Sequence, residues 1–378
     1  MIDDDLNEII SELNASGGAA PARSHEARGQ LEALLEDVVH RRGSDLLLVA
    51  GSPPAIRIDG AVERLSGGIV DGLDIEELVL PALPDRARKQ FAERGVADAS
   101  IRLPALGRFR INLHRERGRA AAAIRALPTR VPLLAELSLP PEIEPLSRLS
   151  RGLVIVGGAT GAGKTTTIAA LVNEINRRDP RHIITAEDPI EYEHAHDRSI
   201  VEQVEIGEDA PDFPTALRSA VRQAPDVLVI GEMRDPESMR IALSAAETGH
   251  LVFSSLHTTD IASTISRICD SFPNERQNTI RQELAFALAA VMTQTLIPKI
   301  GGGRIPAAEL LMVSYGARQH IRKNALQHLH QEMSITRKQG SLTLEDSLGR
   351  LVKSGQISLA DAQARAGHPD EFESVLRK

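Results

Sequence analysis

The chain has almost no cysteine and few aromatic residues. A single cysteine, Cys269, occurs in 378 residues, which excludes an internal disulfide and a zinc site built from several cysteines. Tryptophan is absent, and the aromatic fraction is only 2%. Proteins that bind single-stranded nucleic acid usually stack bases on aromatic side chains, so this composition argues against such binding.

The chain also has no excess of basic charge and no long apolar run. The 44 Lys and Arg are outnumbered by 52 Asp and Glu, for a net charge of −8, whereas proteins that bind duplex nucleic acid are normally basic. No apolar run reaches the ~20 residues of a transmembrane helix; the run at 284–292 soon meets Thr293 and Gln294. The start, MIDDD, is unlike the basic start of a secretory signal, so we expect a cytoplasmic protein.

Charge and hydrophobic pattern divide the chain into three parts. Residues 1–27 carry six acidic residues and one basic residue, and we expect a short amphipathic helix there, followed by a flexible linker. Residues 28–130 mix helices with antiparallel-looking strands, which is typical of an α+β domain. Residues 131–378 alternate apolar strands with helices and become helical from about 316, which indicates an α/β domain with a covered parallel sheet. Strands are expected at 45–50, 54–65, 98–103, 106–113, 120–127, 153–157, 182–186, 227–230 and 251–255, and helices at 74–93, 164–177, 213–223, 235–248 and 260–271.

The strongest motif is GATGAGKT at 158–165, which fits the phosphate-binding pattern G-x-x-x-x-G-K-[ST] between a strand and a helix. Backbone N–H groups of such a loop and the helix N-terminus favour phosphate. Lys164 would contact the β- and γ-phosphates, and the Thr165 hydroxyl would bind Mg²⁺. We therefore predict ATP and Mg²⁺ as ligands. The predicted nucleotide-binding residues are Gly158, Ala159, Thr160, Gly161, Ala162, Gly163, Lys164, Thr165 and Thr166.

Two acidic segments follow strands and are candidates to complete the metal and water site. In PDVLVIGEMRD, Glu232 follows an apolar strand, as in a Walker B motif, although here the acid comes after a glycine. In HIITAEDPIEY, Glu187, Asp188 and Glu191 lie within five residues, where their repulsion needs a cation or hydrogen bonds to offset it. For both segments the alternative is a solvated acidic turn.

Histidines and arginines form a further set of candidates. His250 and His257 flank the strand at 251–255, and either could sense a γ-phosphate, hold a water molecule or be structural. Arg108 and Arg110 are two residues apart, so they share one face of their strand and form a basic face that could line an anion site. A solvated basic strand is the alternative.

The blocks GATGAGKTTT, AEDPIE, GEMRD and AAETGHLVFSSLHTT, in this order and spacing, resemble the PilT-like ATPases of the type II/IV secretion superfamily, the hexameric motors that retract type IV pili. The resemblance covers about residues 30–365. It implies a PAS-like N-terminal domain, a RecA-like ATPase domain with C-terminal helices, and a homohexamer. It also implies only peripheral membrane contact, through an inner-membrane pilus platform protein.

The resemblance also assigns roles to the candidate residues. Glu191 would activate water, with support from Glu187 and Asp188, and Glu232 would serve as the Walker B glutamate and, with Thr165, as a metal ligand. His250 and His257 match the family's histidine box. Arg110 and Arg125 match arginines of the N-terminal domain that approach the nucleotide where subunits meet.

One stretch departs from the family pattern, and the acidic tail has no counterpart in it. The retraction signature AIRNLIRE corresponds here to GARQHIRK at 316–323, which retains only Arg318, Ile321 and Arg322. Pilus or secretion assembly ATPases of the superfamily remain an alternative, but they usually carry a four-cysteine zinc insertion that one cysteine cannot build. A RecA-like nucleic-acid motor and a degenerate regulatory module are further alternatives.

Overall fold

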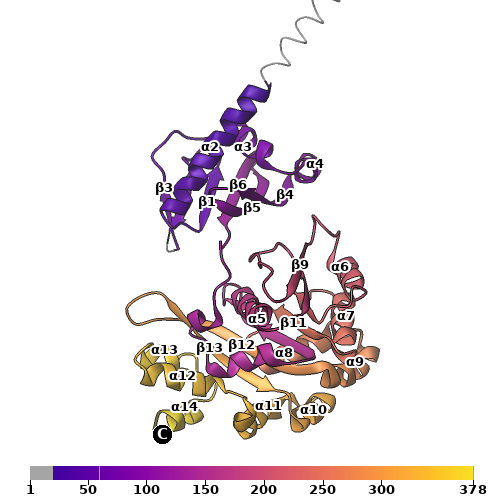
Figure 1. Cartoon of the computed structure of the whole chain (residues 1–378). Helices are drawn as coiled ribbons and strands as arrows, with labels where there is room; N and C mark the ends of the chain where they lie inside the picture. The colour runs from indigo at the N-terminus through magenta and orange to yellow at the C-terminus, as the bar shows by residue number, and fades with distance from the viewer. Residues whose placement is uncertain (1–19, 59, 378) are drawn as a thin grey trace, which may run out of the picture. The chain divides into compact units, whose positions relative to one another are not determined.

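The computed structural model describes residues 20–58 and 60–377, which form two compact units divided between Thr129 and Arg130 (Figure 1). The amphipathic helix expected near residues 6–13 lies outside the described residues. The first helix, α2, begins at Ala20, so residues 20–27 are helical and not the expected linker. Pro21 does not prevent this, because the first turn of a helix tolerates proline.

In its described residues, the first unit is a six-stranded antiparallel sheet in the order β3-β2-β1-β6-β5-β4, together with three α-helices. The expected α+β architecture is therefore confirmed for the described residues. Its core joins α2 to the sheet through buried leucines such as Leu35 and Leu46. The elements are α2 (Ala20–His40), β1 (Asp45–Val49), β2 (Ala55–Ile58), β3 (Ala61–Arg64), α3 (Gly72–Val79), a 3-10 turn (Leu80–Ala82), α4 (Asp85–Arg94), β4 (Val96–Leu103), β5 (Gly107–Glu116) and β6 (Arg119–Ala126).

The single helix expected over 74–93 is wrong. The chain forms α3, a 3-10 turn and α4, with Leu83 in an extended conformation at φ −81° and ψ 146°. Pro84 explains the break, because a proline disfavours the helical conformation of the residue before it.

The second unit contains a seven-stranded sheet in the order β13-β12-β7-β11-β10-β8-β9. The strands from β12 to β9 are parallel and β13 is antiparallel to β12, so the covered parallel sheet expected from the sequence is confirmed and extended. The expected helices all form. The strands are β7 (Gly152–Gly157), β8 (His182–Glu187), β9 (Ile200–Glu205), β10 (Val227–Ile230), β11 (Leu251–Leu256), β12 (Leu288–Pro298) and β13 (Arg304–Met312); the α-helices are α5 (Lys164–Arg178), α6 (Phe213–Ala220), α7 (Pro236–Glu247), α8 (Ile261–Asp270), α9 (Asn274–Ala287), α10 (Tyr315–Arg322), α11 (Leu329–Ile335), α12 (Leu344–Lys353), α13 (Leu359–Gln363) and α14 (Pro369–Arg377).

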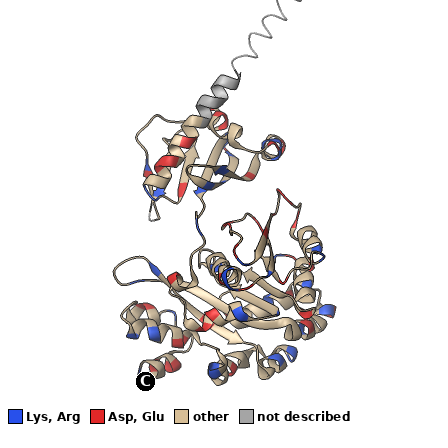
Figure 2. Cartoon of the chain, in the orientation of Figure 1, with Lys and Arg blue, Asp and Glu red and all other residues tan. Residues whose placement is uncertain are grey.

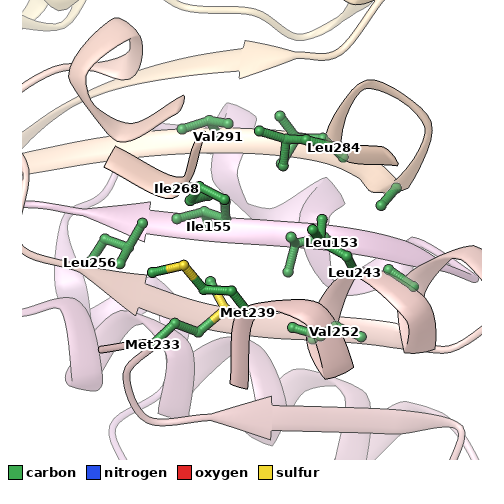
Figure 3. Close-up of a cluster of buried hydrophobic side chains, with 14 of the residues drawn as sticks. Leu153, Ile155, Met233, Met239, Leu243, Val252, Leu256, Ile268, Leu284 and Val291 are labelled. Carbon is green, nitrogen blue, oxygen red and sulfur yellow. The ribbon is translucent and has the colours of Figure 1, made fainter. Parts of the chain in front are cut away.

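Alternate strand residues build two cores, one on each face of this sheet. Leu153 and Ile155 of β7 point to the face covered by α7, α8 and α9 (Figure 3), whereas Val154 and Val156 point to the face covered by α5. The central strands β7, β10 and β11 carry no charged residue, and most charges lie on the surrounding helices and loops (Figure 2). Among the described helices, none is long and apolar enough to cross a bilayer.

Strands β9, β12 and β13 were not expected from the hydrophobic pattern. The apolar run at 284–292 contains the end of α9 and the start of β12, so it does not form one element. The hairpin of β12 and β13 extends beyond the rest of the sheet, and helices α12 and α14 pack on it through Ile297, Leu348 and Phe372. This packing fixes the C-terminal helices to the sheet of the second unit.

Candidate nucleotide site

The GATGAGKT loop connects the carboxyl end of β7 to the first turn of α5, as the motif requires. Gly158 and Gly163 have φ angles of 148° and 88°, a conformation that favours glycine. A Cβ atom at Gly158 would lie 2.6 Å from the Gln294 carbonyl oxygen, and one at Gly163 would lie 3.1 Å from the Gln294 Nε2. Gly158 therefore leaves no room for a side chain, and Gly163 leaves little.

Lys164 is the buried cation of the loop, with an exposed fraction of 7%. Its Nζ donates hydrogen bonds to the carbonyl oxygens of Gly158 at 2.8 Å and Ala159 at 3.0 Å. Burial lowers the pKa of Lys164, while the nearby charges of Glu232 and Glu191 act in the opposite direction. Both predicted acids therefore lie close enough to influence this ammonium group, which neutral carbonyls hold in position.

Glu232 and His257 meet beside Lys164. His257 Nδ1 lies 3.3 Å from Lys164 Nζ, and its Nε2 lies 3.6 Å from a carboxylate oxygen of Glu232. Arg234, which the sequence did not single out, lies with Nη2 2.5 Å from the other oxygen of Glu232. The structure thus brings Glu232, the predicted Walker B glutamate, and one histidine to this loop from the ends of two different strands.

Glu187 is held by a network rather than presented to solvent. Its Oε1 accepts hydrogen bonds from Thr185 Oγ1 at 2.7 Å and Gln203 Nε2 at 3.1 Å. Burial raises the pKa of Glu187, and the hydrogen bonds from Thr185, Gln203 and the Glu191 backbone oppose that rise. These contacts make Glu187 a support for the loop that carries Glu191.

Glu191 and Asp188 lie on that loop between β8 and β9. Glu191 is half-buried and Asp188 is exposed. The next residue, Tyr192, is buried and its hydroxyl lies 3.0 Å from Thr166 Oγ1 at the start of α5. This contact links the acidic loop to the helix of the phosphate loop, so that Glu191 is anchored near Lys164 on both sides.

His250 does not join this cluster in its own chain. It precedes β11, whereas His257 follows it, so the two histidines lie at opposite edges of the sheet, about 20 Å apart along a six-residue strand. His250 Nδ1 lies 2.9 Å from the Ala245 carbonyl oxygen at the end of α7. Within one subunit, strand β11 therefore separates His250 from the phosphate loop, and the assignment of His250 to the histidine box stays a prediction.

Arg110 and Arg125 belong to the first unit, where they are opposite each other on β5 and β6. Arg108 and Arg110 are half-buried, while the intervening Phe109 is buried, so the shared basic face is confirmed. Arg110 lies 3.7 Å from Asp98, and Arg125 Nε donates to Asp45 at 2.9 Å. Their approach to a nucleotide stays a prediction.

Gln294 is a site residue that sequence reasoning missed. It lies on β12 with an exposed fraction of 5%, donates from Nε2 to the Ala162 carbonyl oxygen at 2.6 Å, and accepts from Thr167 Oγ1 at 2.8 Å. It thus ties the phosphate loop to the sheet. The only sequence signal was a polar residue within an apolar run.

Gln294→Ala is expected to loosen the phosphate loop. The substitution leaves two buried hydrogen-bonding groups without their partner, which should lower the free energy of unfolding by about 1–3 kcal/mol. The KM for ATP should rise as the loop loses its fixed shape. Thermal unfolding and ATPase kinetics test this, with the exposed Gln327→Ala as control; equal KM values in the two variants would contradict the tether.

His194 should make the loop between β8 and β9 sensitive to acid. Burial lowers the pKa of His194 from 6.5 to about 4. Between these values the unfolded chain binds the proton and the folded chain does not, so the free energy of unfolding falls as the pH drops from 6.5 towards 4. The loss should reach up to about 3 kcal/mol. His194→Gln should flatten this part of a pH–stability profile, and an unchanged slope would refute the assignment.

Comparisons with known proteins agree with this geometry. Residues 139–339 match the family described as "Type II/IV secretion system protein". The chain is 41% identical over 329 residues to the type IV pilus retraction ATPase PilT of Pseudomonas aeruginosa, covering 87% of this chain and 96% of that protein. It is 38% identical to a twitching motility protein of Neisseria gonorrhoeae, over 86% of this chain and 87% of that protein.

A solved structure is similar over nearly the same length. The crystal structure of the pilus retraction motor PilT with bound ADP is 42% identical in sequence, with a TM-score of 0.83. The match covers 91% of this chain and 98% of that one. The likeness therefore includes both units of the chain.

Proposed function

Because the chain belongs to the type II/IV secretion system protein family and is PilT-like along most of its length, we propose that it is an ATP-hydrolysing motor that powers type IV pilus retraction and twitching motility. The observation that carries the catalytic part is the buried Lys164, held by loop carbonyls between Glu232 and His257. The mechanical part rests on similarity to a retraction ATPase over 87% of this chain.

The finer fold assignments are part of this proposal. We assign the second unit to the RecA-like ATPases, because its phosphate loop leaves a central parallel strand and the acids follow neighbouring strands. We assign the first unit, an antiparallel sheet with helices, to the PAS-like domains. The assembly is proposed to be a homohexamer that acts on the cytoplasmic side of the inner membrane, where it contacts a pilus platform protein.

In hydrolysis, each residue of the site has a distinct proposed task. Lys164 and the N–H groups at the start of α5 bind and orient the phosphates. Glu191 accepts the proton of the attacking water, while Glu187 holds its loop in place through Thr185 and Gln203. His257, which lies near both Lys164 and Glu232, can relay the state of the γ-phosphate to the Walker B strand.

The residues present also suit a divalent cation. Mg²⁺ prefers oxygen ligands, and the site offers the Thr165 hydroxyl on α5 and the Glu232 carboxylate after β10. When bound, Mg²⁺ would neutralise charge on the phosphates. Arg234 holds one oxygen of Glu232 and so fixes the orientation of this carboxylate.

Helix α10 bears on the mechanical role. The three positions that match the retraction signature help to attach this helix to α9: Ile321 is fully buried, Arg318 donates to the Ala285 and Phe286 carbonyls, and the Arg322 guanidinium lies 4.5 Å over the Phe286 ring. Of the altered positions, Ala317 is also fully buried, so the support for a motor role comes from the three retained contacts.

Deletion of the gene in a piliated host tests the proposal. We expect cells with more surface pili than wild type and no twitching, because assembly continues while retraction stops. Complementation with the wild-type gene should restore both. Loss of pili would instead indicate an assembly motor, and stimulation of the purified ATPase by DNA would indicate a nucleic-acid motor.

Arg110 and Arg125 are predicted to act on the nucleotide of a neighbouring subunit. Arg110→Ala and Arg125→Ala should retain ATP binding but lose turnover by roughly 10³–10⁵-fold, the range typical of arginines supplied in trans. Mixing either variant with a Lys164→Ala variant should restore part of the activity, since mixed rings contain intact composite sites.

The control is Arg86→Ala, which removes an exposed arginine from α4 of the same unit. Subunit exchange in the mixtures should be verified with labelled protein. Exchange without any gain in activity would refute action in trans.

A further inference from the structure

Two histidines and two glutamates converge among the C-terminal helices, outside the nucleotide site. His330 comes from α11, Glu345 from the first turn of α12, His368 from the residue before α14, and Glu371 from the first turn of α14. One ligand atom of each residue lies within 4.8 Å of the corresponding atoms of the other three. We refer to these four residues as the His₂Glu₂ cluster.

The two imidazole rings of the cluster lie face to face. Their centroids are 3.6 Å apart at an interplanar angle of 21°. His330 Nε2 lies 2.6 Å from a carboxylate oxygen of Glu371, and His368 Nδ1 lies 3.5 Å from a carboxylate oxygen of Glu345. The nitrogen and oxygen atoms that can bind a cation therefore lie close together, within 4.8 Å of one another.

The two carboxylates are already fixed in position. Glu345 has an exposed fraction of 1%, and its Oε1 accepts the backbone N–H of His368 at 2.9 Å. The Oε1 of Glu371 accepts from Arg337 at 2.6 Å and Thr343 at 3.3 Å, while its other oxygen faces His330. Such positioning by outer contacts is characteristic of carboxylates that bind metals.

The local charge balance favours a cation. A single guanidinium, that of Arg337, pairs with both Asp346 and Glu371, whereas Glu345 faces His368. Arg350, the other arginine nearby, forms its ion pair with Glu142. Buried carboxylates are costly unless they are paired or coordinate a metal, and Glu345 is the most buried of the three.

We propose that the His₂Glu₂ cluster binds one Zn²⁺ ion and thereby ties α14 to α11 and α12. Two imidazole nitrogens with two carboxylate oxygens form a ligand set suited to zinc, and four protein ligands make a closed, structural site. Zinc–ligand distances of about 2.0–2.2 Å place tetrahedral ligands about 3.4 Å apart. The longest separation between two ligand atoms, up to 4.8 Å, must therefore shorten by about 1.4 Å, which rotation of the stacked rings can provide.

The ion would strengthen an attachment that already rests on hydrophobic packing and on the contacts of Glu371 with Arg337, Thr343 and His330. Helix α14 joins the β12–β13 hairpin through the buried Phe372, one residue after Glu371. Figure 1 shows α12 and α14 at the C-terminal end of the chain. Metal ligands from α11, α12 and α14 would hold the last helix against the rest of the ATPase unit under load.

Metal binding by the full-length protein tests the proposal. After chelator treatment and removal of the chelator, titration with Zn²⁺ alone should give one tight site per chain and raise the Tm, whereas Mg²⁺ should not compete at this site. His368→Gln, at an exposed position, and His330→Gln should each weaken Zn²⁺ binding at least about tenfold, since even loss of an outer contact typically costs 10–100-fold.

His328→Gln is the matched control, because it removes an exposed histidine from the same segment. It should bind Zn²⁺ as wild type does. Circular dichroism verifies that each variant is folded. If His330→Gln does not fold, His368→Gln alone still tests the proposal. Absence of a tight site in wild type, or equal affinity in wild type and His368→Gln, would overturn the proposal and leave the cluster as a hydrogen-bonded ion-pair network.

Discussion

Lys164→Ala is expected to abolish ATP hydrolysis, with a loss of at least about 10²–10³-fold, the usual cost of removing a group that stabilises developing charge. The lysine is buried and held by the Gly158 and Ala159 carbonyls, so solvent cannot readily compensate for the loss of its charge. Steady-state phosphate release measures the loss. In the host, the same variant should reproduce the deletion phenotype.

The expected loss has a matched control and a clear counter-result. Lys323→Ala removes an exposed lysine at the end of α10 and should hydrolyse ATP as wild type does. Lys164→Ala should remain folded, although the two freed carbonyls should lower its free energy of unfolding by about 1–3 kcal/mol. A folded Lys164→Ala protein with substantial turnover would refute the assignment of the phosphate loop.

Glu191→Gln is expected to bind ATP but hydrolyse it about 10²–10⁴-fold more slowly, the range of general base catalysis. The amide has the shape of the carboxylate but cannot accept the proton of water. Nucleotide binding measured by fluorescence, together with single-turnover hydrolysis, separates affinity from chemistry. The variant should therefore accumulate the ATP-bound state.

Two further acids serve as comparisons for Glu191. Glu187→Gln should lose less activity, because Glu187 is held by Thr185 and Gln203 and supports the loop. Glu232→Gln should raise the Mg²⁺ concentration needed for activity, since this residue is the proposed metal ligand. Equal turnover and equal Mg²⁺ dependence in all three variants and wild type would contradict this division of roles.

Much of the ATPase unit could be predicted from sequence, because its signals are local. The glycines, lysine and threonine of GATGAGKT lie within eight consecutive residues, and the acids lie at or shortly after the ends of apolar strands. Parallel strands end at the same edge of a sheet, so Glu232 and His257 could be expected near the loop. The same reasoning puts His250 away from the loop, because a residue just before a strand lies at the opposite edge of the sheet.

Contacts between distant segments were decided only by the tertiary structure. Gln294 reaches Ala162 across 132 residues of sequence, and its position as a polar residue in an apolar run does not indicate this contact. The His₂Glu₂ cluster likewise assembles only when α11, α12 and α14 pack on the β12–β13 hairpin. Motifs consist of neighbouring residues and can therefore be recognised in the sequence. Contacts and clusters formed by distant segments depend on how strands and helices pack, which the local sequence pattern does not specify.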